Sequence, residues 1–424
     1  MSARTKLDPT AALFSVDPGL RTPYVQQWNF GLQRRLPHNT VIEARYVGNK
    51  GTKLLRAFDF NQVLLRENGF LDDFLRARSN GQLALERFGR FEPEFNGAVV
   101  GSQPLTFFPQ LEFGGALDSS TVQELIRTGQ PGSLAELYIR NGYTEGRAVS
   151  FRRNQNALVG DLVTNYSSSS YHALQLEARR RAARGIIWQA NYSLSKVLTD
   201  SSGTQVRFDP FLDNAQPRLE RARATFDLRH VFNANLVWDL PLGSGKLRDG
   251  WTVGSIWNWQ SGAPLSVISE RGTINRPSRS TQNTASTSLT KPQLGDVLRF
   301  RMSDDGPYYV AASAINPRDG TGVASDFLEP FTGQVFTHPG AGEVGTLQRR
   351  MFDGPSAFGF DFSLMKRTAL SETHTLTFGA RVENVLNHPT FFAGDQFLDD
   401  EQFGRITSTL TSPRRVELFV RWAF

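Results

Sequence analysis

The sequence predicts an all-β fold: an antiparallel, up-and-down transmembrane β-barrel fragment of about nine long strands, with short periplasmic turns and long extracellular loops that contain short helices. Two observations predict it. Apolar and polar residues alternate over runs of about ten residues, and the connections between these runs are alternately short and long. No apolar stretch reaches the length of about 18 residues that a transmembrane helix needs.

The composition agrees with such a barrel. The chain has 424 residues, with 37 Gly, 32 Phe, 7 Trp and no Cys, and its mean hydropathy is only −0.35. A barrel strand alternates apolar and polar side chains, so its average hydropathy stays unremarkable even inside a membrane. The absence of cysteine fits an oxidising compartment, although many cytosolic proteins also lack this residue.

Nine segments carry the alternation. In the first, Trp28, Phe30 and Leu32 alternate with polar residues or glycine, and the last shows the same pattern up to the terminal Phe424. Val231, Val237 and Phe419 interrupt the pattern. The clearest alternation in each predicted strand lies within residues 24–34, 42–46, 171–180, 188–194, 227–239, 251–260, 358–364, 376–383 and 415–424.

A soluble β-sandwich also alternates, but three features favour the barrel. The strands are longer than the usual five or six residues of globular sheets, and Trp and Tyr collect near strand ends, as in an interfacial girdle. The connections alternate between about four to ten residues and roughly 30 to 120 residues, as expected for periplasmic turns and extracellular loops. Because short periplasmic turns and long extracellular loops alternate, the last of the nine strands ends in the periplasm, and so does the C-terminus.

The two longest loops, 48–170 and 262–355, have different character. In the first, Phe70, Leu71, Phe74 and Leu75 recur at helical spacing, and Asn80-Gly81 is expected to end that helix. Ser133 and Glu136 form a predicted capping box, with Asn141-Gly142 as the end of a second helix. This loop is expected either to cap the barrel mouth or to contact ligand.

Loop 262–355 is rich in Ser, Thr, Asn and Gly, especially over 279–290, and is expected to be mobile.

Charge and the N-terminus bear on partners. The net charge is +6, but Lys and Arg are spread along the chain, and the one dense run, Arg179–Arg181 with Arg184, falls in a turn, so no nucleic-acid partner is expected. Residues 1–6 are not followed by the apolar core of a signal peptide. We therefore expect a truncated chain, with residues 1–23 as the remnant of an extracellular loop and 24–424 as part of a barrel.

Candidate chemical motifs are weak. Gly243-Ser244-Gly245-Lys246 lacks the leading glycine of a phosphate loop, since position 240 is leucine, and a hairpin turn explains it better. The six histidines show no metal-ligand spacing and no nucleophile elbow occurs. Asp72-Asp73 and Asp399-Asp400-Glu401 are candidates for Ca²⁺, for which solvated loop acids are the commoner explanation. We expect no catalytic residue, no cofactor and no metal.

Several segments, in order along nearly the whole chain, carry a family resemblance: FSVDPGLRTPYVQQWNFGLQ at 14–33, YHALQL at 171–176, NYSLSK at 191–196, FDLRH at 226–230, ENVLNHP at 383–389 and RWAF at 421–424. The sequence resembles the C-terminal barrel of TonB-dependent outer-membrane receptors, in the branch with a carboxypeptidase-regulatory-like N-terminal domain. The resemblance implies a barrel of about 22 strands, filled by an N-terminal plug on which the TonB energy-transducing complex pulls. Neither the plug nor a signal peptide is found in this chain.

Partners and site residues follow from the resemblance and the alternation. The expected partners are outer-membrane lipid, the plug, TonB, the barrel-assembly machinery and an unknown extracellular ligand, and Val420, Trp422 and Phe424 resemble the assembly signal. The expected function is uptake of a large, scarce nutrient, with a structural or adhesive surface protein and a soluble carbohydrate-binding sandwich as alternatives. A lumen-facing polar wall, in contact with plug or substrate, is predicted from Gln175, Glu177, Asn191, Arg229, Asn233, Arg381 and Glu383.

Overall fold

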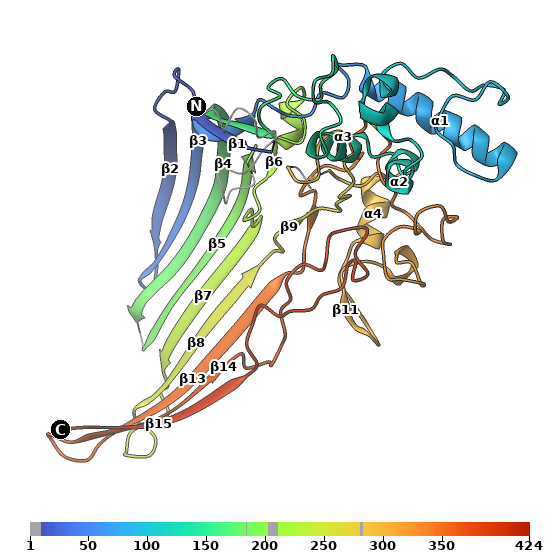
Figure 1. The fold of residues 1–424 in the computed structure, drawn as a ribbon. Helices are drawn as coiled ribbons and strands as arrows, with labels where there is room; N and C mark the ends of the chain where they lie inside the picture. The colour runs from blue at the N-terminus through green and yellow to red at the C-terminus, as the bar shows by residue number, and fades with distance from the viewer. Residues whose placement is uncertain (1–9, 184, 202–210, 280–282) are drawn as a thin grey trace.

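Nine long strands dominate the structure, a computed structural model that describes residues 10–183, 185–201, 211–279 and 283–424. Each long strand pairs antiparallel with the next one along the chain (Figure 1). All nine predicted strands are confirmed. They are β2 (Tyr24–Leu36), β3 (Thr40–Asp59), β4 (Val159–Ala183), β5 (Ile186–Thr199), β7 (His230–Asp239), β8 (Trp251–Gln260), β13 (Ala357–Ala369), β14 (Thr375–Glu383) and β15 (Arg415–Ala423).

The two faces of this sheet differ in polarity because successive side chains of a strand point to opposite sides. One face carries the apolar series that begins with Trp28, Phe30 and Leu32, and it is not covered by a second layer. Trp28 is 39% exposed and Phe378 is 47% exposed, whereas Trp188 and Phe360 are half-buried. A sandwich would bury these rings between two sheets, so the sandwich alternative is wrong and the apolar face is free to meet lipid.

The sheet is curved and open (Figure 1). Its edge strands are β2 and β15, and the path between them does not close on itself within the described residues. Strands of nine or ten residues, such as β7 and β15, match the length that a tilted strand needs to cross a bilayer. An odd number of antiparallel strands cannot close with antiparallel pairing at the seam, and the observed sheet is open.

The N-terminal segment and the longest strands extend beyond the predicted limits. β3 has 20 residues and β4 has 25, so the first long loop covers 60–158 rather than 48–170. Residues predicted as a loop remnant include a strand, β1 (Ala12–Val16), which pairs in parallel with the first five residues of β4. This pairing depends on a partner nearly 150 residues away, which local alternation does not encode. A short strand, β6 (Ala222–Arg223), pairs with the end of β5.

The helical loop, residues 60–158, folds around its own core. It contains α1 (Phe70–Phe88), η1 (Phe108–Gln110), η2 (Glu112–Gly115), α2 (Ser120–Arg127) and α3 (Pro131–Arg140). Phe70 lies at the centre of an aromatic cluster, with its ring centroid 4.7 Å from that of Phe151 and 5.1 Å from that of Phe107. None of the helices in the described ranges combines the length and the apolar character that crossing a membrane requires.

Two local predictions for this loop are wrong. Asn80-Gly81 does not end the first helix: α1 continues to Phe88 and ends at Gly89, which adopts a left-handed conformation with φ 73°. Ser133 and Glu136 do not form a capping box, because Gln130 is the N-cap of α3 and Glu136 pairs with Arg140. The predicted end of that helix at Asn141-Gly142 is confirmed.

The β8–β13 loop, residues 261–356, is packed rather than loose. It contains β9 (Pro264–Leu265), α4 (Lys291–Val297), β10 (Arg301–Ser303), β11 (Gly306–Tyr308), η4 (Ala312–Ala314) and β12 (Phe352–Asp353). A buried apolar cluster holds it together and includes Leu398 and Phe403 from the connection between β14 and β15. The expectation of a mobile loop therefore does not fit its described part, because its apolar residues are buried. Residues 280–282, within the stretch singled out as mobile, lie outside the described residues.

Candidate functional site

The polar face of the sheet carries a row of carboxylate and amide side chains across five neighbouring strands. Glu43 on β3 is level with Glu177 on β4, and the row continues through Asn191 on β5, Asn233 on β7 and Asn258 on β8. Three members, Glu177, Asn191 and Asn233, are predicted wall residues. Glu43 and Asn258 are missing from the prediction, although their place in the alternation puts them on the same face.

Two carboxylates stand directly opposite each other in this row. Like charges at opposed positions destabilise a sheet, and here each carboxylate has an arginine two residues further along its own strand. Arg179 lies 3.0 Å from Glu177, and Arg45 pairs with Glu43. The row is therefore a charge-balanced polar surface. It offers many hydrogen-bond donors and acceptors to a molecule or domain that lies against this face.

The other predicted wall residues lie elsewhere on the same face. Arg381 and Glu383 line a groove of about 570 Å³ together with Asp361 and Asn235, and Arg381 lies 3.8 Å from Glu417 on β15. Gln175 is the neighbour of Glu177 toward the loops, level with Ser193.

Arg229 directly precedes β7, and its carbonyl accepts a hydrogen bond from the backbone N–H of Ser195 at 2.8 Å. The six predicted residues that lie within strands thus share one face, whereas Arg229 lies just before its strand. They do not converge on a single binding site.

At the loop end of the sheet, a buried ion cluster joins the two long loops to β3 and β4. The Asp59 carboxylate on β3 lies 2.8 Å from Arg276 and 3.3 Å from Arg279, both in the β8–β13 loop. Arg279 also pairs with Asp161 on β4, and Arg276 donates to the carbonyl of Leu158 at 2.6 Å. Buried charges need partners of opposite charge, and these ion pairs hold the loop at one place over the strands.

A second buried cluster fixes the connection between β5 and β7, in which η3 (Pro217–Glu220) lies. Glu220 is paired with Arg56 of β3 at 3.3 Å and with Arg349 of the β8–β13 loop at 2.6 Å. The Arg56 guanidinium also stacks on the ring of Phe211, 3.9 Å from its centroid. Sequence reasoning missed both clusters, because their members are separated by more than 100 residues.

The helical loop and the β8–β13 loop interlock through glycines. The backbone N–H of Gly132 donates to the carbonyl of Gly272 at 2.7 Å, and a Cβ atom on Gly132 would lie 2.2 Å from the carbonyl oxygen of Asn275. Arg66 donates to the carbonyl of Gly342 at 2.6 Å. We call these two interlocked loops the loop layer; it sits at one end of the sheet (Figure 1).

Burial changes the proton affinity of groups in the loop layer. Burial lowers the pKa of Arg152 to about 10, with a further contribution from the like charge of Arg276. Burial also lowers the pKa of Arg276, against the opposing effect of Asp59. The Tyr138 hydroxyl is buried, which raises its pKa, and it donates to the carbonyl of Gly115 at 2.7 Å. These groups keep their ordinary protonation at neutral pH and act as structural partners.

Motifs suggestive of chemistry resolve into structural features. The segment around Gly243 and Gly245 is a turn between β7 and β8 in which both glycines have positive φ, 104° and 112°. Within the described ranges, no group of three potential metal ligands converges. Ser269 lies 2.8 Å from His338, which lies 3.0 Å from Asp399, but Ser269 is fully buried, so its hydroxyl is not placed to meet a substrate.

The predicted assembly signal lies on the edge strand β15. Val420 is 66% exposed, Trp422 is 62% exposed and Phe424 is 90% exposed, and the first two lie on the apolar face, level with Phe378 and Leu376 of β14.

Toward the loop end, the same face carries two Tyr–His pairs. The Tyr46 hydroxyl lies 2.7 Å from His172, and that of Tyr192 lies 2.7 Å from His230. Such amphipathic rings are typical of membrane interfaces.

Comparisons with known proteins agree with this geometry. A family model described as outer membrane beta barrel domain matches residues 2–417. The fold is similar to the outer membrane transporter YddB from Escherichia coli, at 11% identity over 98% of this chain and 34% of that chain, with a TM-score of 0.41. It is also similar to the ferric enterobactin receptor PfeA from Pseudomonas aeruginosa, at 10% identity over 100% and 36%, with a TM-score of 0.36.

The pyoverdine-bound FpvA of P. aeruginosa is similar at 10% identity over 95% of this chain and 27% of that chain, with a TM-score of 0.33. The chain thus spans about a third of the length of these structures. No curated protein sequence matches it. The family match covers nearly the whole chain: the chain belongs to the outer membrane β-barrel domain family, and its place is the bacterial outer membrane.

Proposed function

We propose that this sheet is part of a barrel that imports a large, scarce nutrient in a TonB-dependent manner. The observation that supports this best is the polar row from Glu43 to Asn258, which lies on the face opposite the exposed apolar one. A barrel built from this sheet would have lipid outside and a wide polar interior. Such an interior suits a plug that is held by hydrogen bonds and displaced during transport.

The loop layer supports the same proposal. Its two loops are interlocked and joined to β3 and β4 through Asp59 and Asp161, so the entrance would be a preformed surface rather than a set of loose loops. A preformed surface captures ligand without the cost of ordering flexible loops. The nutrient classes that suit such an entrance are chelated metals, oligosaccharides and peptides, which are too large for porins.

The wall residues have a specific role in this proposal. Glu177, Asn191 and Asn233 would be hydrogen-bond partners of a plug rather than direct substrate contacts, because they belong to a continuous row and not to a closed pocket. A plug that moves during transport is best held by many weak contacts that can break together. Hydrogen bonds from amide side chains are such contacts, since each contributes about 0.5–1.5 kcal/mol.

The test is uptake in cells. A strain without the gene is grown on chelated iron, oligosaccharides or peptides as the limiting nutrient, beside the complemented strain and a strain without TonB. We expect one nutrient class to require both this gene and TonB. Unchanged growth on every class, or uptake that persists without TonB, would overturn the proposal, and loss of surface attachment with unchanged uptake would favour the adhesive alternative.

A further inference from the structure

Cationic side chains lie on the apolar face of the sheet near its short turns. Arg34, Arg180 and Lys366 follow Leu32, Ala178 and Leu364 by two residues, so each points to the same side as these apolar neighbours. Lys366 donates to the carbonyl of Asp249 and lies 5.8 Å from the ring of Trp251. A charge facing hydrocarbon is costly, so these side chains must extend to the lipid headgroups, as long basic side chains do.

The whole turn end of the sheet is basic. Each of its four turns is flanked by basic residues, at Arg34–Arg35, Arg179–Arg181, Lys246 with Arg248, and Lys366–Arg367. The acidic residues of the same turns are few: Asp239, Asp249 and Glu372. Asp239 accepts a hydrogen bond from the Thr252 hydroxyl at 2.7 Å. The turn end therefore presents an excess of positive charge to the leaflet beside it.

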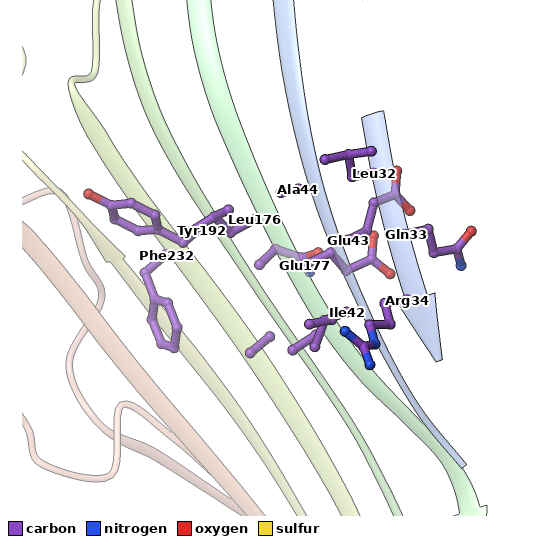
Figure 2. A pocket seen from close by; sticks show the side chains of 13 residues that line it. Leu32, Gln33, Arg34, Ile42, Glu43, Ala44, Leu176, Glu177, Tyr192 and Phe232 are labelled. Atoms are coloured by element: carbon purple, nitrogen blue, oxygen red, sulfur yellow. The ribbon is translucent and has the colours of Figure 1, made fainter. Parts of the chain in front are cut away.

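An apolar groove of about 480 Å³ is lined in part by Arg34, and Arg180 follows its lining residue Ala178 by two positions. On the apolar face its lining includes Leu32, Ile42, Ala44 and Leu176 (Figure 2), together with Ala178 and Ala190. Glu43 and Glu177, whose side chains belong to the polar face, also border it. Across β3, β4 and β5 the groove passes over three residues at the same level, Ile42, Ala178 and Ala190. The groove forms there because the two alanine side chains are small.

Arg34 is level with Ile42, and Arg180 is level with Thr40 on the same strand. The two arginines thus flank the turn-side end of β3. Arg34 is exposed and has no acidic partner among the described residues.

We propose that this surface binds a glycerophospholipid with an anionic headgroup from the leaflet on the turn side. The headgroup phosphate lies between Arg34 and Arg180, and an acyl chain lies in the groove lined by Ile42, Ala178 and Ala190. Lys366 on β13, several strands away on the same face, would contact the headgroup of a separate lipid. Charge complementarity selects this occupant, because a groove that only fills with lipid tails would need no cations at its end.

The test uses the protein in the outer membrane of its own cells, extracted into copolymer nanodiscs with the surrounding lipid. Lipid mass spectrometry measures the ratio of anionic to zwitterionic glycerophospholipid relative to the bulk membrane. We expect enrichment around the unaltered protein. Each neutralisation among Arg34→Gln, Arg180→Gln and Lys366→Gln should lower that enrichment about fivefold, the factor that corresponds to about 1 kcal/mol per basic residue.

The sheet provides a matched control. Arg35→Gln and Arg367→Gln remove the same charge at two of the same turns, but from the polar face, and should leave the enrichment unchanged. The charge-conserving set Arg34→Lys, Arg180→Lys and Lys366→Arg should retain it, which separates charge from folding. Equal enrichment in all variants, equal loss in both neutralised sets, or co-purification of an acidic protein in place of the lipid would overturn the proposal.

Discussion

The indole ring of Trp28 on β2 lies over Gly48, its cross-strand partner on β3. A Cβ atom on Gly48 would lie only 2.3 Å from Nε1 of the indole. The same arrangement occurs at the other edge of the sheet, where the ring of Phe419 on β15 covers Gly379 on β14, 2.1 Å from where a Cβ atom would be. Aromatic rings that cover glycines pin the register of a sheet, and here they do so at both edge pairs.

Replacing Gly48 by alanine should therefore destabilise the sheet. The new methyl group forces the Trp28 ring to move, and overpacking of this kind costs about 1–3 kcal/mol. Gly31→Ala on β2 is the control, because its Cβ would meet nothing nearer than 3.7 Å. The measurement is the folded fraction, in the outer membrane, of the closed barrel that contains this sheet, seen as heat-modifiable migration on gels. Equal losses in the two variants would contradict the role of the ring.

The strands of this fold are predictable from sequence because alternation is local information. Nine segments alternate over about ten residues, and each forms a strand. Phe419 breaks the pattern because it lies on the polar face, where it covers Gly379. The lengths of β3 and β4 and the pairing of β1 are not predictable in this way, because those residues are held by partners more than 100 positions away.

The loops are less predictable because tertiary contacts override local signals. Asn80-Gly81 fails to stop α1 because Gly81 packs against Phe91, whose ring would lie 2.4 Å from a Cβ atom there, and because the Asn80 side chain is bonded to Gln103. The polar β8–β13 loop folds because its scattered apolar residues meet those of a distant connection. The predicted wall residues within the strands share a face because alternation along each strand decides it. The ion clusters of the loop layer form only when segments distant in the sequence come together.

Asp73 is expected to hold the helical loop together. It is fully buried in the first turn of α1, and its carboxylate accepts hydrogen bonds from the backbone N–H groups of Thr106 at 2.8 Å, Phe107 at 2.7 Å and Phe108 at 3.1 Å. Asp73→Ala leaves these donors without an acceptor and should cost about 3–5 kcal/mol. Limited proteolysis of intact cells should then cut within residues 60–158.

The exposed neighbour provides the control for this prediction. Asp72→Ala removes the same charge one residue earlier, at a position that faces solvent, and should leave the loop resistant. Cleavage of both variants at the same rate would show that the carboxylate of Asp73 does not organise the loop.

The β8–β13 loop should become more resistant to protease on acidification. Burial and the nearby carboxylates of Asp399, Asp395 and Asp400 raise the pKa of Glu270, and burial raises the pKa of Asp395. A raised pKa in the folded state favours the protonated form, so stability is highest below the ordinary pKa of these acids. It is lost as pH rises through the raised values.

Cleavage of this loop should accordingly be slower at about pH 4, near the ordinary pKa of these acids, than at about pH 7. The double variant Glu270→Gln with Asp395→Asn should lose most of this difference and resemble the acidified protein at neutral pH. Glu329→Gln, an exposed position of the same loop, should keep it. Asp399 does not contribute in this window, because its pKa is lowered: burial raises it, but the hydrogen bond from His338 and the charges of His338 and Arg271 together outweigh burial. Faster cleavage at low pH would contradict the predicted direction of the pH dependence.

The open edges of the sheet lead to a prediction about residues 1–424 expressed alone. β2 and β15 run in the same direction, since strands alternate along the path, so they cannot pair antiparallel with each other. Closure requires an odd number of further strands between them. Without these, the edge N–H and C=O groups face lipid unpaired, at several kcal/mol each. We expect aggregation or degradation and no heat-modifiable monomer in detergent. A soluble, monomeric product with a cooperative melting transition would show that the edges are satisfied in some other way.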